Sequence, residues 1–166
     1  MSTIRPALAA DLPALKALLE SAYRGDSARA GWTHEADLLE DERITAEDLA
    51  AALADPAQHT LVALDDAGAV YGTITITDKG DGLSYLGMLA VDPARQAGGL
   101  GRALITAGED VARGFGAKRM EMTVISRRAE LIAYYERRGF LRTGETRPFP
   151  YGGVTHLAMV VLEKSL

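Results

Sequence analysis

The chain has 166 residues, 48% of them hydrophobic, with a formal net charge of −5 and no cysteine. This length and apolar content predict a single domain over residues 1–166 with one substantial core. The acidic balance argues against broad nucleic-acid binding, and the lack of cysteine excludes disulfides, thiolate metal sites and a cysteine nucleophile. No segment resembles a signal peptide or a membrane span, so we expect a cytoplasmic protein that does not enter membranes.

Helical periodicity and helix-start signals predict the first half of the chain. Leucines recur at helical spacing after Asp11 and Pro13, two residues typical of a helix start. Thr45, followed three residues later by Asp48, resembles a capping box, and Pro56 ends the apolar pattern behind it. We therefore expect a strand at 3–5, a helix at 11–23, a long loop at 24–44 that can include one helical turn, and a helix at 46–54.

Strand-like runs and one glycine-rich segment predict the second half. Three runs joined by short polar turns, at 59–64, 70–77 and 83–91, are most simply three antiparallel strands. A glycine loop, a helix within 98–115 and a strand at 120–124 follow, which is typical of a βαβ unit. A helix at 129–138 and strands at 140–145 and 155–162 complete the chain.

The segment MLAVDPARQAGGLGRAL, residues 88–104, carries the most specific signal. A strand ends at Val91, and three glycines precede a helix. Glycines let backbone N–H groups converge on an anion, and the helix start adds partial positive charge, so the segment predicts a pyrophosphate site. No Gly-Lys-Ser/Thr triplet follows Gly101, which excludes a Walker loop. Leu104 stands where a dinucleotide fingerprint needs its third glycine.

A known superfamily combines these features. The stretch Gln96-Ala97-Gly98-Gly99-Leu100-Gly101 matches the Gln/Arg-x-x-Gly-x-Gly/Ala pattern of the GNAT acetyltransferases. The preceding Leu89-Ala90-Val91-Asp92-Pro93 and the later Tyr135-Glu136-Arg137-Arg138-Gly139-Phe140 are also similar to that superfamily. The chain thus resembles a GNAT N-acetyltransferase over nearly its whole length. The resemblance implies a mixed α/β fold with about seven largely antiparallel strands, splayed after the fourth, and about four flanking helices.

The resemblance also implies acetyl-coenzyme A (acetyl-CoA) as co-substrate, with no metal. The pantetheine arm would lie in the splay, bound by backbone groups of Leu89 and Val91, and amides of the glycine loop would hold the pyrophosphate. An N–H aimed at the thioester oxygen would stabilise the charge that develops there. The implied cofactor-binding residues are Leu89, Ala90, Val91, Gln96, Ala97, Gly98, Gly99, Leu100, Gly101, Arg102, Ala103 and Ser126.

Several positions near the implied cofactor leave alternatives open. Tyr135 would protonate the departing thiolate, although a tyrosine on this helix face is also a normal packing residue. Many members carry a cofactor-binding asparagine just before the last helix, and here Ser126 or Arg128 replaces it. Arg95 and Arg102 either steer phosphates or are merely solvated.

The acceptor is predicted only as a class. Without a cysteine to carry the acetyl group, we expect direct transfer to a primary amine of a small molecule or peptide. The candidate substrate-binding residues are Trp32, His34, Glu35 and Tyr151, and the candidate bases are His34, Glu35 and Glu121. A non-catalytic module that binds or senses acyl-CoA is the alternative function. The resemblance also implies a homodimer.

Overall fold

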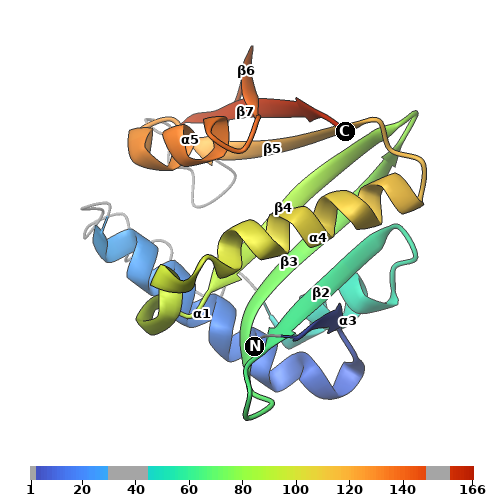
Figure 1. Cartoon of the computed structure of the whole chain (residues 1–166), viewed down its shortest axis with the longest axis vertical. Coiled ribbons are helices and arrows are strands. Elements are labelled where there is room, and N and C mark those ends of the chain that lie inside the picture. Colours follow the sequence, from blue (N-terminus) through green and yellow to red (C-terminus); the bar gives the residue numbers. More distant parts are fainter. Residues whose placement is uncertain (1–2, 30–44, 149–157) are drawn as a thin grey trace.

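The structure is a computed structural model that describes residues 3–29, 45–148 and 158–166 (Figure 1). The described elements, in chain order, are β1 (Thr3–Pro6), α1 (Leu12–Arg29), α3 (Ala46–Ala54), β2 (Gln58–Leu64), β3 (Val70–Gly80), β4 (Leu83–Val91), α4 (Leu100–Gly114), β5 (Arg119–Ile125), α5 (Ala129–Glu136), β6 (Leu141–Pro148) and β7 (Ala158–Ser165). Short 3₁₀ helices at Ala9–Asp11 and Pro93–Gly98 lead into α1 and α4.

The predicted helices and strands are present, with end points that differ by a few residues. The capping box is confirmed, because the Asp48 N–H donates to Thr45 Oγ1 at 3.0 Å. The loop predicted at 24–44 is wrong over 24–29, where α1 continues. A glycine inside a helix, here Gly25, costs only about 1 kcal/mol relative to alanine, which tertiary context readily outweighs. Residues 30–44 lie outside the described part of the chain.

The sheet has the strand order β1-β2-β3-β4-β5-β7-β6, and all neighbouring pairs are antiparallel except β4 and β5. Helix α4 joins these two parallel strands as the predicted βαβ unit. They pair only where Leu83 to Tyr85 lie opposite Arg119 to Glu121, and then diverge (Figure 1). The predicted seven-stranded, largely antiparallel sheet with a splay after the fourth strand is therefore confirmed.

A β-bulge in β4 sets the geometry of the splay. Thr75 pairs with Gly87 whereas Thr73 pairs with Ala90, so two β4 residues stand opposite one β3 residue. Met88 lies at the bulge with a left-handed φ of 50°. Because a bulge inserts one residue, the side chains of all later residues in the strand point to the opposite face of the sheet. Even-numbered β4 residues accordingly pack toward α4 before the bulge and toward α1 after it.

Two apolar clusters hold the layers on opposite faces of the sheet. The larger lies under α4 and α5, with Leu104, Ile132 and Phe140 among its buried residues. The smaller joins α1 and α3 to the other face through Leu19 and Leu49. We call β1–β4 with α1, α3 and α4 the N-terminal arm, and β5–β7 with α5 the C-terminal arm. The two arms meet at the short β4–β5 pairing and leave the splay between them.

Candidate functional site

A cleft of about 880 Å³ lies in the splay between the two arms. Its lining residues come from α1, β4, the start of α4, and α5 with its flanking residues. They are Ala22, Leu89, Ala90, Val91, Gly99, Gly101, Arg102, Arg128, Glu130, Leu131, Tyr134, Tyr135 and Arg138. The cleft thus brings the predicted strand and glycine loop together with the predicted Tyr135, although they are far apart in the sequence.

The start of α4 forms one end of this cleft. Gly99 precedes the helix with φ 76°, a left-handed conformation that glycine adopts without strain. The Ala103 N–H donates to the Gly99 carbonyl at 3.2 Å, so it is used inside the helix. The earlier amides, of Leu100, Gly101 and Arg102, have no acceptor within a helix. They and the helix dipole favour an anion at this end of the cleft.

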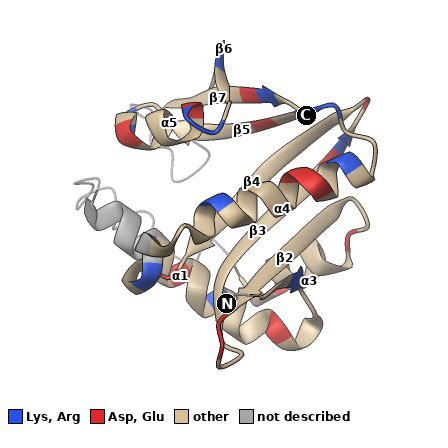
Figure 2. Cartoon of the chain, in the orientation of Figure 1, with Lys and Arg blue, Asp and Glu red and all other residues tan. Residues whose placement is uncertain are grey.

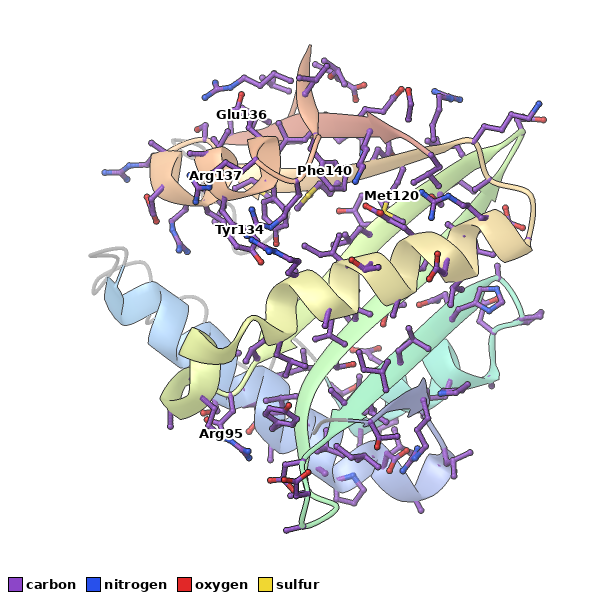
Figure 3. All side chains as sticks on the ribbon, in the orientation of Figure 1. Arg95, Met120, Tyr134, Glu136, Arg137 and Phe140 are labelled. Carbon is purple, nitrogen blue, oxygen red and sulfur yellow. The ribbon has the colours of Figure 1, made fainter. Side chains whose placement is uncertain are left out.

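The space around Gly101 is also too small for a side chain. A Cβ placed on Gly101 would lie 2.9 Å from the Tyr134 hydroxyl oxygen. Tyr134 projects from α5 toward α4 (Figure 3), so the two arms approach closely at this point. A side chain here would push the arms apart or fill the space in front of the helix start.

The exposed edge of β4 forms the floor of the cleft. No described strand pairs with this edge beyond Tyr85, because β5 turns away there. After the bulge, Leu89 and Val91 pack on the α4 side of the sheet, while Ala90 is buried against α1. An extended arm laid along this edge could exchange hydrogen bonds with the β4 backbone as an added strand does.

Helix α5 supplies side chains from the opposite wall. Tyr135 is 6% exposed and packs edge-on against Tyr134 and Phe140, with ring centroids 5.3 and 6.0 Å away. The Arg138 guanidinium stacks over the Tyr134 ring, 4.1 Å from its centroid. Leu131 completes this face. Tyr135 therefore belongs to the core and also lines the cleft.

Arg128, rather than Ser126, lines the cleft at the start of α5. Its side chain is 11% exposed, and its Nε donates to Glu130 Oε1 at 2.6 Å. This hydrogen bond is the largest cause of a lowered pKa of Glu130, so that carboxylate stays ionised. The Ser126 amide instead donates to the Ala158 carbonyl at 2.8 Å, and Ser126 is not among the lining residues.

Arg95 lies away from the cleft. Its guanidinium donates to Asp65 Oδ2 at 2.6 Å and stacks over the Tyr71 ring at 4.3 Å. Arg95 is the largest cause of a lowered pKa of Asp65. Figure 3 shows Arg95 well separated from Tyr134. Of the two arginines considered for phosphate steering, only Arg102 lines the cleft.

Other predicted site residues are only partly described. Gln96 and Ala97 belong to the 3₁₀ helix before α4, but their side chains are not described. Gly98 ends that 3₁₀ helix. The candidate acceptor residues lie outside the described residues: Trp32, His34, Glu35 and Tyr151.

Among the candidate bases, only Glu121 lies within the described residues, and it forms an ion pair with an arginine. Its carboxylate is 3.3 Å from Arg147 Nη2, and it is 8% exposed. Glu121 alternates along β5 with Met120 and Met122, which belong to the core under α4. Its side chain therefore lies on the opposite face of the sheet, and Glu121 is not among the lining residues of the cleft.

Sequence reasoning missed Tyr134, Glu130 and Arg138 as cleft residues. The sequence spacing could have indicated Tyr134 and Arg138, because residues 131, 134, 135 and 138 repeat at helical intervals. Once Tyr135 is considered for the site, that spacing brings Tyr134 and Arg138 onto nearly the same face. Basic residues lie both at the start of α4 and around α5 (Figure 2).

The family model of the acetyltransferase (GNAT) family matches residues 13–140. The chain belongs to this family. The resemblance predicted from the glycine loop and the Tyr135–Phe140 segment is confirmed.

Among curated proteins, this GNAT chain is 36% identical over 126 residues to mycothiol acetyltransferase of Beutenbergia cavernae. The match covers 73% of this chain and 41% of that protein, so the chain spans about two-fifths of the relative's length.

Solved structures share the fold over the whole chain. PaiA N-acetyltransferase of Thermoplasma acidophilum, in complex with coenzyme A, has a TM-score of 0.83 at 16% identity and covers 100% of this chain and 99% of its own. YncA of Salmonella typhimurium, with acetyl-CoA, has a TM-score of 0.75 at 23% identity, covering 100% and 94%. These GNAT neighbours hold the cofactor that the sequence predicts.

The described part of this GNAT chain holds no cluster of three or more acidic or histidine side chains placed to bind a metal. Within the same residues, no helix is both long and apolar enough to cross a membrane.

Proposed function

We propose that this chain is an acetyl-CoA-dependent N-acetyltransferase that moves the acetyl group directly to a primary amine. The cleft supports this proposal best, because it joins an anion-binding helix start to an unpaired strand edge and a tyrosine. These are the groups needed for a phosphate, an extended amide arm and a leaving thiolate. Among the described lining residues, three arginines outnumber one glutamate, and this charge balance suits a polyanionic cofactor.

Each wall of the cleft takes a separate role in the proposed reaction. Amides of Leu100, Gly101 and Arg102 bind the pyrophosphate, and the β4 edge at Leu89 binds the pantetheine arm. A backbone N–H of β4 stabilises the oxyanion as the amine attacks. Tyr135 then protonates the departing thiolate.

The amine must lose a proton before it attacks. A free amine with an ordinary pKa near 10.4 is almost wholly protonated at neutral pH, and removing that proton costs on the order of 4 kcal/mol. Glu121 is paired with Arg147 on the sheet face away from α4 and α5. His34 and Glu35 remain alternative bases. Since the chain has no cysteine, the acetyl group passes to the amine without an enzyme thioester.

The acceptor class rests on likeness to other proteins. One structural neighbour is the ribosomal-protein-S18-alanine N-acetyltransferase of Escherichia coli, with a TM-score of 0.76 at 20% identity. Mycothiol acetyltransferase adds a small-molecule enzyme to the comparison. We therefore propose a small-molecule or peptide amine as acceptor. The single domain, the homodimer and the cytoplasmic location stay predictions, and light scattering at working concentration tests the dimer.

A panel of amines tests the proposal against a non-catalytic module. The parent protein is incubated with acetyl-CoA and each amine, and free coenzyme A thiol is measured over time. We expect thiol release that depends on both protein and amine. Tight binding of acetyl-CoA with no amine-dependent release across the panel would instead support an acyl-CoA-binding or sensing module.

A further inference from the structure

Arg138, on the wall of the cleft, has a guanidinium nitrogen for which the described residues provide no hydrogen-bond acceptor. Its Nε is buried and makes no hydrogen bond within the described residues. Buried donors are nearly always satisfied, so an unsatisfied one suggests a missing acceptor. The residue follows α5 and lines the cleft, so the missing acceptor can come from a bound molecule.

The Tyr134 ring fixes where the Arg138 guanidinium can act. The guanidinium lies flat over that ring, 4.1 Å from its centroid. The hydroxyl of the same ring reaches the start of α4, 2.9 Å from the position of a Cβ on Gly101. Arg138 and the first amides of α4 therefore border the same end of the cleft, from opposite arms.

The charges around the cleft favour an anion at Arg138. Among the described residues that line the cleft, Glu130 is the only acidic one, and Arg128 Nε lies 2.6 Å from its carboxylate. No acidic side chain of the described residues forms an ion pair with Arg138. A guanidinium donates two parallel hydrogen bonds from its fork, and that geometry matches the oxygens of a phosphate.

We infer that Arg138, held in place by the Tyr134 ring, binds a phosphate group of coenzyme A. This inference rests on the proposed function. The pyrophosphate and the 3′-phosphate share the chemistry that the guanidinium recognises, and either can supply the acceptor for Nε. Arg138 then adds a side-chain contact from the C-terminal arm to the backbone contacts that α4 makes.

Calorimetric titration with coenzyme A and with 3′-dephospho-coenzyme A tests this assignment. Arg138→Ala should weaken coenzyme A binding about tenfold or more, since charged hydrogen bonds are lost. If Arg138 binds the 3′-phosphate, the affinity for the dephosphorylated ligand stays at the parent value. If it binds the pyrophosphate, both affinities fall by the same factor.

Arg137→Ala is the matched control, because Arg137 carries the same charge at the same helix end but is exposed and outside the cleft. It should bind both ligands as the parent does. Arg138→Lys keeps the charge without the fork and should bind more weakly than the parent, which provides a folded variant should Arg138→Ala fail to fold.

Two results would overturn the assignment. In one, folded Arg138 variants bind both ligands within twofold of the parent, with only the melting temperature changed, so that Arg138 merely packs on Tyr134. In the other, Arg137→Ala loses as much affinity as Arg138→Ala, so that any positive charge there suffices. A parent protein that does not bind coenzyme A at all would contradict the proposed function itself.

Discussion

The two arms of the molecule contribute to the cleft in different ways. The N-terminal arm offers mainly backbone: the β4 edge beyond the bulge and the first amides of α4. The C-terminal arm offers side chains, among them Tyr134, Tyr135 and Arg138 on one face of α5 and its end. Substitutions in the N-terminal arm should therefore impair the site where a new side chain enters the cleft. In the C-terminal arm, loss of a single functional group should be enough to impair it.

The arms also differ in how they are supported. In the N-terminal arm, helices cover both faces of the strands. The C-terminal arm ends in the edge strand β6, where Leu141 is 69% exposed. The larger apolar cluster spans both arms. Polar contacts between the arms include the short β4–β5 pairing, the Ser84–Arg119 and Tyr85–Thr123 hydrogen bonds and the Lys164–Glu109 ion pair. The comparison can be tested at these polar contacts.

The largest effect is expected from Tyr135→Phe in the C-terminal arm. The variant keeps the ring contacts with Phe140 and removes only the hydroxyl. General acid catalysis contributes about 10² to 10⁴ in rate, so kcat should fall at least 100-fold with little change in acetyl-CoA affinity. Steady-state kinetics and calorimetry measure the two quantities. Tyr134→Phe, which changes the neighbouring tyrosine in the same way, should leave kcat nearly unchanged.

A turnover within about threefold of the parent, under conditions where chemistry is rate-limiting, would make Tyr135 a packing residue only. The proton would then come from water or another group. The cofactor site would remain intact under that result, because its other contacts do not involve the Tyr135 hydroxyl.

Lys164→Met should reduce stability by breaking an ion pair between the arms. Lys164 Nζ on β7 donates to Glu109 Oε2 on α4 at 2.7 Å, and Glu109 is 7% exposed. The variant leaves that carboxylate with only the more distant Arg113 Nη2, 4.0 Å away, which should lower the free energy of unfolding by about 2 kcal/mol in urea titration. The more exposed Arg119–Glu163 pair lies within one arm, and Arg119→Met should cost at most about 1 kcal/mol. Equal losses in both variants would show that the inter-arm position of Lys164 has no special effect.

Gly101→Glu tests the N-terminal arm, where intrusion rather than loss should matter. The new side chain meets the Tyr134 hydroxyl and places a carboxylate at the helix start that we propose binds phosphate. Coenzyme A affinity should fall at least about tenfold, or about 1.4 kcal/mol. Gly114→Glu makes the same change at the far end of α4, where a Cβ meets no atom within 4 Å, and should bind normally. Unchanged affinity in a folded Gly101→Glu protein would remove this loop from the site.

Local patterns made most of the fold predictable from the sequence. The helix at 46–54 followed from the Thr45 cap, and the glycine loop from its position between a strand and a helix. The sequence did not reveal the cause of the splay. A bulge at Met88 depends on how β4 pairs with β3, and the sequence of β4 alone does not predict that pairing.

The sequence predicted cleft-lining residues where they are neighbours along the chain, and it missed others that only the fold brings near. Leu89 to Val91 and the loop were found because they adjoin in sequence. Arg95 is a phosphate candidate in the sequence for the same reason, but in the structure it pairs with Asp65 from a hairpin turn. Arg138 was missed because its approach to the start of α4 exists only after α5 packs beside it.

The smallest expected effect concerns the hydrogen bond at the point where the arms separate. Tyr85 Oη and Thr123 Oγ1 lie 2.8 Å apart, just beyond the last β4–β5 backbone pair, Tyr85 with Glu121. Both side chains are half-buried, so each can reach water when its partner is removed, and Tyr85→Phe or Thr123→Val should each cost only about 1 kcal/mol of stability. A double-mutant cycle by urea titration should give a coupling energy of about 0.5 to 1 kcal/mol, because the stability losses of two residues in direct contact do not simply add.

If this contact also sets the width of the cleft, both single variants should weaken coenzyme A binding by a similar small factor. The double variant should then weaken binding by no more than either single variant. Additive losses in stability together with parental affinity would mean that the short backbone pairing and the Lys164–Glu109 contact fix the two arms without it.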